Sequence, residues 1–160
     1  MARADFFDAS ALLRIYSDEP HSDIVRAYFR GRATKYTTPF CFYEALNGLK
    51  SKWKFKMQFS QEQYQRASLA LTAWYGASSR TISDLDFANP LVFSQTNQLV
   101  EKYGLDLSDA FQIMSVKHGY FSVLVNASAT VLVTADQQLC MAARAEGLRV
   151  WNALEEHPPI

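Results

Sequence analysis

Hydrophobic and polar residues alternate along the chain in a pattern that predicts short buried strands separated by amphipathic helices. A strand is expected from Ala4 to Phe7, followed by a helix from Ala9 to Tyr16. The chain closes in the same way, with an apolar strand from Thr130 to Thr134, a helix from Gln137 to Glu146 and a strand from Leu148 to Trp151. Both ends therefore contribute strands to a buried sheet.

The middle of the chain is predicted to be mostly helical. Ser60 and Gln63 have the spacing of a capping box, Asn89 before Pro90 is typical of a helix start, and Gly104 is typical of a helix end. The expected elements are a helix from about Pro20 to Arg30, a strand from Tyr36 to Thr38, and helices from Pro39 to about Trp53, Ser60 to about Ala77, Pro90 to Tyr103 and Leu107 to Lys117.

This order of elements predicts an α/β fold with three layers, α/β/α, around a mostly parallel central sheet. No repeat, low-complexity tract or linker rich in Pro, Gly and Ser interrupts the chain, so residues 1–160 are expected to form a single domain. In such sheets, ligands bind outside the carboxyl ends of the strands. That edge is where functional residues are expected.

The charge balance, the cysteines and the lack of a long apolar run argue against several classes of protein. Sixteen basic residues balance 16 acidic ones, which argues against a protein that coats nucleic acid by bulk charge and predicts that any such contact is local. Cys41 and Cys140 lie far apart and in no ligand spacing, so both are expected to be buried, reduced thiols rather than zinc ligands or a disulfide. The acidic start and the lack of a long apolar run predict a cytoplasmic protein with no membrane partner.

Two acids directly follow predicted strands. Asp8 and Asp136 each lie between a strand and a helix, which places both at the same edge of a parallel sheet. Each residue taken alone is explained equally well as a helix N-cap, because an aspartate accepts hydrogen bonds from the free N–H groups there. Position alone does not decide between capping and chemistry.

Two further acids lie within predicted helices. Asp109 falls one turn before Ile113, at the margin of an apolar face, and its alternative role is a favourable interaction with the helix dipole worth about 0.3–1 kcal/mol. Glu44 is expected to face small neighbours, and its alternative role is that of an ordinary solvated helix glutamate. Together, four clustered carboxylates would repel by about 4 kcal/mol per close pair, so such a cluster requires cations. Oxygen ligands alone favour Mg²⁺ or Mn²⁺.

A run of lysines and aromatic residues follows the Glu44 helix. Lys50, Lys52, Lys54 and Lys56 alternate with aromatic side chains in a pattern suited to phosphate contacts and base stacking, so they are candidate RNA-binding residues. The alternative is that these lysines complement the dipole at a helix C-terminus while the aromatic residues pack inward. The three histidines lack partners in the sequence and are expected at the surface: His21, His118 and His157.

Four segments together match a known family. Phe7-Asp8-Ala9-Ser10, Tyr43-Glu44-Ala45-Leu46, Leu107-Ser108-Asp109-Ala110 and Val133-Thr134-Ala135-Asp136 occur in this order. They resemble the conserved segments of PIN-domain nucleases, particularly the VapC-like toxins of toxin–antitoxin pairs. The stretches from 44 to 109 and from 117 to 129 are longer than in a compact toxin of that type.

The resemblance implies a set of functional expectations. It implies an endoribonuclease that uses Mg²⁺ or Mn²⁺, a type II toxin with a small antitoxin as partner, and a homodimer. Asp8, Glu44, Asp109 and Asp136 would be the catalytic and metal-binding residues. Supporting roles beside them fall to Ser10, Thr134 and Asp106.

Two other protein classes share part of this pattern. A phosphatase of the haloacid-dehalogenase type also starts with an aspartate after a strand, but it needs a second aspartate where this chain has Ser10. A PIN-like module that binds RNA or protein without catalysis is the alternative that stays open, because its acids would act only as helix caps and solvated charges.

Overall fold

The centre of the molecule is a sheet whose strands are apolar. The computed structural model describes residues 3–159, and within them the strands are β1 (Ala4–Phe7), β2 (Thr34–Tyr36), β3 (Val131–Thr134) and β4 (Arg149–Asn152). These four strands form one sheet in the order β2-β1-β3-β4. Every pairing in it is parallel, so the predicted mostly parallel sheet is confirmed and is parallel throughout.

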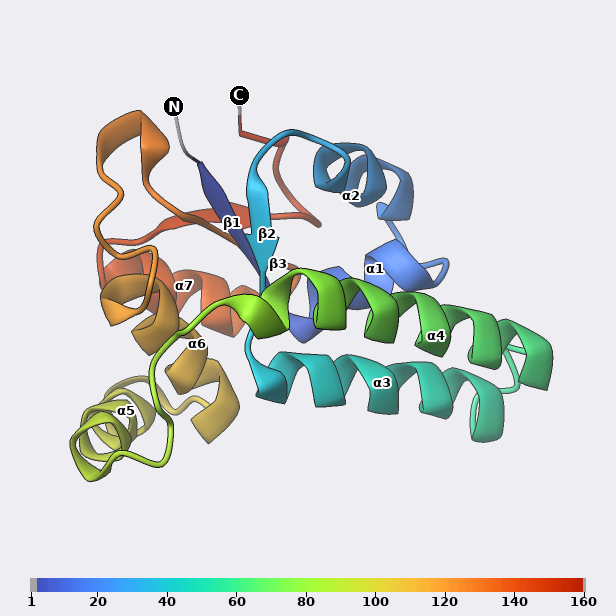
Figure 1. Cartoon of the computed structure of the whole chain (residues 1–160), viewed down its shortest axis with the longest axis horizontal. Coiled ribbons are helices and arrows are strands. Elements are labelled where there is room, and N and C mark those ends of the chain that lie inside the picture. Colours follow the sequence, from blue (N-terminus) through green and yellow to red (C-terminus); the bar gives the residue numbers. More distant parts are fainter. Residues whose placement is uncertain (1–2, 160) are drawn as a thin grey trace.

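Helices cover both faces of the sheet and continue beyond its lower edge (Figure 1). In the described part of the chain, two short 3₁₀ turns, Ser79–Thr81 and Asn126–Ser128, accompany seven α-helices. The helices are α1 (Ala9–Tyr16), α2 (Ser22–Phe29), α3 (Pro39–Lys54), α4 (Gln61–Ala77), α5 (Pro90–Tyr103), α6 (Leu107–His118) and α7 (Gln137–Ala145).

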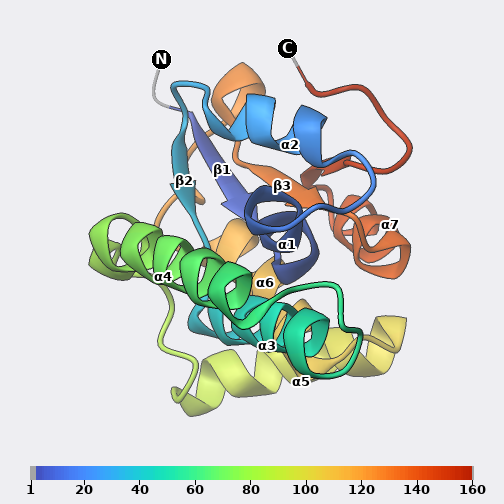
Figure 2. The same cartoon turned by 90° about the vertical axis from the view of Figure 1, so that its right-hand side faces the viewer.

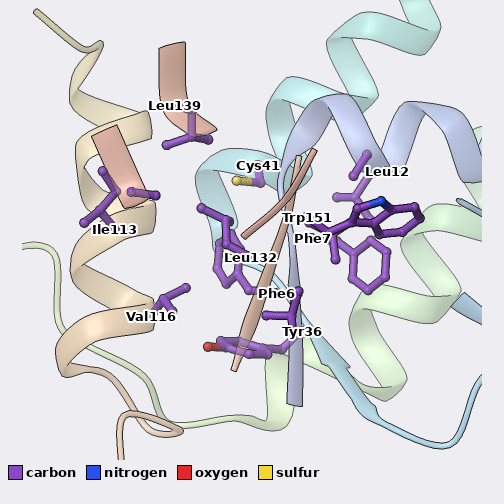
Figure 3. Packing of buried hydrophobic residues seen from close by; sticks show 14 of the residues in the cluster. Phe6, Phe7, Leu12, Tyr36, Cys41, Ile113, Val116, Leu132, Leu139 and Trp151 are labelled. Atoms are coloured by element: carbon purple, nitrogen blue, oxygen red, sulfur yellow. The ribbon is translucent and has the colours of Figure 1, made fainter. Parts of the chain in front are cut away.

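The core lies on both sides of the sheet and defines three layers. Figure 3 shows Leu12 of α1 on one side of the strands, and Ile113 of α6 with Leu139 of α7 on the other. All three side chains are fully buried, as are Phe7 and Trp151 of the sheet. Each such side chain stabilises the fold by about 1.5–3 kcal/mol relative to an exposed position. The predicted α/β/α arrangement is therefore present.

Local sequence signals account for most element ends. Ser60 and Gln63 form the capping box at the start of α4, and Gly104 ends α5 in the left-handed conformation with φ 66°. The second strand differs from its prediction at both ends, since β2 runs from Thr34 to Tyr36 rather than from Tyr36 to Thr38. The Thr37 hydroxyl donates to the carbonyl of Phe7 at 2.6 Å, and Thr38 caps α3, so both threonines leave the sheet.

The long stretch between Glu44 and Asp109 is filled by a helical hairpin and by α5. In Figure 1 and Figure 2, α3 and α4 lie side by side and extend away from the sheet. Stacked aromatic rings join them at both ends: Phe42 on Tyr75 with centroids 4.1 Å apart, and Trp53 on Tyr64 at 4.9 Å. Such pairs add about 0.5–1.5 kcal/mol beyond their buried area.

The second long stretch, residues 119–130, is a loop that returns to the sheet. Phe121 packs on Tyr36 of β2 with ring centroids 4.8 Å apart, while Tyr120 and Val123 face solvent. Among residues 3–159, no helix combines the length and apolar character that crossing a bilayer requires.

One carboxylate ties three helices together. Glu146, just after α7, accepts hydrogen bonds from Lys102 at 2.8 Å and Tyr103 at 2.6 Å in α5, and from Lys117 at 2.6 Å in α6. Its side chain is only 10% exposed. Hydrogen bonds from Lys102 first, then from Lys117 and Tyr103, lower the pKa of Glu146 to about 2.

We expect Glu146→Gln to lower the free energy of unfolding by about 1–3 kcal/mol at pH 7, because charge-assisted hydrogen bonds are lost. The pKa of Glu146 is depressed from 4.5 to about 2, so this stabilisation is present above pH 4.5 and disappears as the pH falls through 2. Urea unfolding of wild type and variant at several pH values measures the difference.

The control is Glu62→Gln, which removes an exposed pair with Arg66. Its cost should stay below about 1 kcal/mol, as is usual for surface ion pairs. Equal unfolding midpoints for Glu146→Gln and wild type at pH 7 would refute the role given to Glu146.

Candidate active site

Asp8 lies at the end of the central strand β1, where α1 begins. Its side chain is 3% exposed and accepts a hydrogen bond from the backbone N–H of Ala11 at 2.7 Å, so it caps α1. Two hydroxyls also donate to it: Ser10 at 2.7 Å and Thr134 at 2.6 Å. The capping role considered from the sequence is present, and the carboxylate is in addition fixed by side chains.

These two hydroxyls connect the ends of β1 and β3. The Ser10 oxygen accepts from the backbone N–H of Ala135 at 2.8 Å. The Thr134 oxygen accepts from the N–H of Asp136 at 2.9 Å. Each hydroxyl therefore donates to Asp8 and accepts from the loop that follows β3, which fixes the loop relative to the carboxylate.

Asp136 follows β3 at the same edge of the sheet and caps α7. Its carboxylate accepts from the backbone N–H of Leu139 at 2.9 Å, and its side chain faces solvent. Asp106 occupies the N-cap position of α6 and is exposed, but its side chain makes no capping hydrogen bond. Asp136 is thus the N-cap of α7 and is also an exposed carboxylate at the sheet edge, so the two interpretations of its sequence position are compatible.

Glu44 projects from the first half of α3 into solvent, the orientation of the alternative role as a solvated helix glutamate. Its carboxylate accepts a hydrogen bond from the Ser108 hydroxyl at 2.7 Å, across 64 residues of sequence. This bond joins α3 to the N-terminal end of α6. Asp109, the next residue after Ser108, is thereby held on the same side of the molecule as Glu44.

Asp109 is half-buried and accepts a hydrogen bond from the Gln112 amide at 2.9 Å. Burial is the main cause that raises the pKa of Asp109 to about 7, and the negative charges of Asp8, Asp136 and Glu44 contribute to this rise in that order. The charges of the other three acids therefore act on Asp109. Because the ionised form is repelled by its neighbours, positive charge at this position would be stabilising.

Asp8 shows the same effect in a weaker form. The pKa of Asp8 is raised to about 6, mainly by burial and in smaller part by the charge of Asp136. The hydrogen bonds from Thr134, Ala11 and Ser10 oppose it by stabilising the ionised carboxylate. Two carboxyl groups with raised pKa values at one edge of a sheet are typical of a functional site.

The acids fit a divalent cation in donor chemistry, since all four offer carboxylate oxygens, the ligands that Mg²⁺ and Mn²⁺ prefer. They are not assembled in binding geometry: across residues 3–159, no three His, Cys, Asp or Glu side chains are placed to hold one ion. The carboxylates instead accept from helix N–H groups, from hydroxyls and from an amide. Glu44 and Asp136 are exposed and have room to turn.

The lysine run lies at the far end of α3. Lys50, Lys54 and Lys56 are exposed. Lys52 differs, because its side chain is buried and pairs with Glu19 at 2.5 Å, so it is not available to RNA in this structure. Sequence spacing did not reveal this pairing, because its partner precedes Lys52 by 33 residues.

Three neighbours of the acids were not among the sequence candidates. Ser108 and Gln112 bond Glu44 and Asp109, and Cys41 is buried close enough to Asp8 for its charge to act on the thiol. Burial raises the pKa of Cys41 to about 12, which makes it an inert thiol. The i to i+3 spacing of Asp109 and Gln112 was the one available signal. As expected, Cys41 and Cys140 are buried and unpaired, and the histidines are exposed: His21, His118 and His157.

Comparisons with known proteins agree with this architecture. The family model described as the PIN domain matches residues 6–145. The crystal structure of FitAcB from Neisseria gonorrhoeae is similar to the chain with a TM-score of 0.61 and 13% identity, covering 95% of this chain and 99% of that one. At this identity the likeness establishes the fold. No curated protein sequence matches the chain.

The matched residues span all four acidic segments, from β1 through Glu44 and Asp109 to Asp136 and α7. The resemblance drawn from the sequence motifs is thus confirmed by a match over most of the chain. Members of this family are generally nucleases. The chain belongs to the PIN domain family.

Proposed function

We propose that the chain is an endoribonuclease that depends on Mg²⁺ or Mn²⁺ and hydrolyses RNA through Asp8, Glu44, Asp109 and Asp136. The observation that supports this most is electrostatic: the charges of Asp8, Asp136 and Glu44 all act on the half-buried Asp109. Asp8 and Asp136 directly follow β1 and β3 at the carboxyl edge of a parallel sheet, where ligands bind in such folds.

Each acid has a distinct part in the proposed mechanism. Asp8, Glu44 and Asp109 would hold a first cation, and Asp136, with Asp8 or Asp109, would help to hold a second or orient the attacking water. When bound, such an ion supplies positive charge at the scissile phosphate and makes water more acidic. Ser10 and Thr134 fix the direction of the Asp8 carboxylate, which leaves less reorganisation for the reaction.

We further propose that the chain is the toxin of a type II toxin–antitoxin pair and acts as a homodimer. The resemblance of its motifs to VapC-like toxins supports this assignment. A small antitoxin would then be its partner, since an unregulated ribonuclease inside a cell is harmful.

A non-catalytic PIN-like module that binds RNA or protein is the second candidate. One observation favours it: the described carboxylates are engaged as helix caps and hydroxyl acceptors, and no three of them are in binding geometry. Metal binding separates the two functions, because only the nuclease needs its acids to turn toward a cation.

Asp109→Asn should stabilise the metal-free protein at pH 8 by about 1–3 kcal/mol, because it removes a desolvated charge among like charges. The pKa of Asp109 is raised from 3.8 to about 7, so its ionisation destabilises the fold increasingly from pH 4 to 7 and fully above pH 7. The stability gained by Asp109→Asn should therefore disappear as the pH falls toward 4. Mn²⁺ at about 100 times its Kd should stabilise wild type by about 2.7 kcal/mol and the variant little.

Thermal unfolding with and without Mn²⁺ between pH 5.5 and 8 measures both effects, and Mn²⁺ affinity of wild type should fall below pH 7 as protons compete. The matched control is Asp23→Asn, an exposed aspartate of α2 whose loss should change stability by less than about 1 kcal/mol and leave the Mn²⁺ response unchanged. A wild-type protein that gains no stability from Mn²⁺ at any of these pH values would favour the non-catalytic module.

Asp8→Asn should reduce Mg²⁺-dependent RNA cleavage at least about 100-fold while leaving the circular dichroism spectrum native, since an amide binds the cation poorly. Induced expression of wild type should arrest bacterial growth and that of Asp8→Asn should not. Asp23→Asn again serves as the control.

A folded Asp8→Asn protein that cleaves at the wild-type rate would contradict the proposed chemistry. A wild-type protein that cleaves RNA without affecting growth would reject the toxin assignment alone.

Thr134→Val should lower the cleavage rate about 10–100-fold, the usual effect of losing a group that orients a metal ligand. The substitution keeps the shape of the side chain but removes the donor to Asp8 and the acceptor for the N–H of Asp136. Thr134→Ser restores the hydroxyl and should recover most of the activity. If serine and valine reduce cleavage equally, the hydroxyl has no positioning role.

A further inference from the structure

One side of α3 stays exposed from the acidic site to the end of the helix. Five residues on it, which we name the α3 track, all face solvent: Tyr43, Asn47, Lys50, Lys54 and Phe55. Tyr43 lies beside Glu44 and is 65% exposed, and Phe55 follows the last helical residue and is 76% exposed. At 3.6 residues per turn, the four members of the track within the helix point within about 60° of one another: Tyr43, Asn47, Lys50 and Lys54. Phe55 follows at the C-terminal end of the helix.

The track carries positive charge that is not neutralised locally. Within residues 3–159, no carboxylate lies within ion-pair distance of Lys50, Lys54 or Lys56. Lys54 lies over the Trp53 ring at 4.0 Å, a contact that fixes the ammonium group and leaves its charge exposed. A polyanion would therefore be attracted along this side of the helix.

The turn that presents Phe55 is held by the backbone. The carbonyl of Ser51 accepts from the N–H groups of Phe55 at 3.0 Å and Lys56 at 2.9 Å, and the carbonyl of Lys52 accepts from Gln58 at 2.8 Å. The buried ion pair between Lys52 and Glu19 anchors the same turn to the body of the protein. An exposed ring on an ordered turn can be contacted at little entropic cost.

The composition of the track favours single-stranded nucleic acid over a protein partner. Its two aromatic rings are separated by polar and basic residues, with Asn47 and Lys50 between them, so the apolar surface is interrupted along the track. Alternating aromatic rings and lysines are suited to single-stranded nucleic acid, because unpaired bases stack on the rings while phosphates contact the ammonium groups. In a duplex the bases already stack on one another, so they cannot stack on Phe55.

We propose that single-stranded RNA lies along the α3 track, with one base stacked on Phe55, phosphates on Lys50 and Lys54, and the strand entering the acidic site past Tyr43. This inference rests on the proposed function in taking RNA as the substrate. Phe55 lies 11 positions after Glu44, about 16 Å along the helix direction. At 3.4 Å per stacked nucleotide this is about five nucleotides, within the range of single-strand sites.

Fluorescence anisotropy with a labelled single-stranded RNA of about 12 nucleotides tests the proposal, in EDTA so that neither cleavage nor bound cations contribute. Phe55→Ala should weaken binding at least about fivefold, Phe55→Leu should weaken it similarly, and Phe55→Trp should retain it, because only an aromatic ring stacks. Lys54→Ala should reduce the slope of log affinity against log salt by about 0.7. The same sequence as a duplex should bind without sensitivity to Phe55.

Two matched controls isolate the track. Met57→Ala removes an apolar side chain that is 80% exposed at the same turn but carries no π-face, and Arg32→Ala removes one exposed positive charge on the loop between α2 and β2. Both should leave affinity and salt slope unchanged. Full affinity in Phe55→Leu, or equal loss in Met57→Ala, would overturn base stacking.

Other occupants and the proposed function are distinguished by separate results. A wild-type dimer that dissociates in Phe55→Ala with unchanged RNA affinity would overturn the proposal and make the track an interface between copies. Cleavage by wild type with an unaltered KM in Phe55→Ala would also reject the track while leaving the nuclease intact. The predicted binding pattern without any metal-dependent cleavage would support the track and reject the nuclease.

Discussion

A charged group buried at the end of the central strand must be satisfied by hydrogen bonds, and around Asp8 this requirement organises the candidate site. Leaving such a group unpaired would cost several kcal/mol. Three donors meet it, from α1, from Ser10 and from Thr134 at the end of β3. The two hydroxyls also accept from the loop after β3, so satisfying one carboxylate fixes where Asp136 lies.

Around this fixed carboxylate the protein gathers further negative charge, which opposes its own folding. The raised pKa values of Asp8 and Asp109 express this cost, since each group is harder to ionise in the folded chain than in water. Packing elsewhere offsets it: rings stack between α3 and α4, and Glu146 joins three helices. A fold stabilised away from its site can tolerate repulsion within it.

The sequence predicted those features that depend on neighbouring residues. Apolar runs, caps and glycine ends placed nearly every helix and strand, and the order of the acidic segments indicated the edge where they lie. Both ends of β2 were misplaced by two residues. At its C-terminal end, Thr37 bonds to Phe7, a contact that forms only after the strands pair. The same reason hid the hydroxyl bridge between Asp8 and Thr134, 126 residues apart, and the burial of Lys52 against Glu19.

The two ends of α3 lie in different surroundings within the hairpin of α3 and α4. The first half of α3 carries the exposed Glu44 beside buried residues such as Phe42 and Ala45, whereas its last turn and the following residues extend beyond the sheet (Figure 1). Exchanges at exposed positions there usually change stability by less than about 0.5 kcal/mol. Substitutions at the exposed positions of this tip can therefore change what the protein recognises without disturbing the carboxylate edge, so that recognition and chemistry can evolve independently.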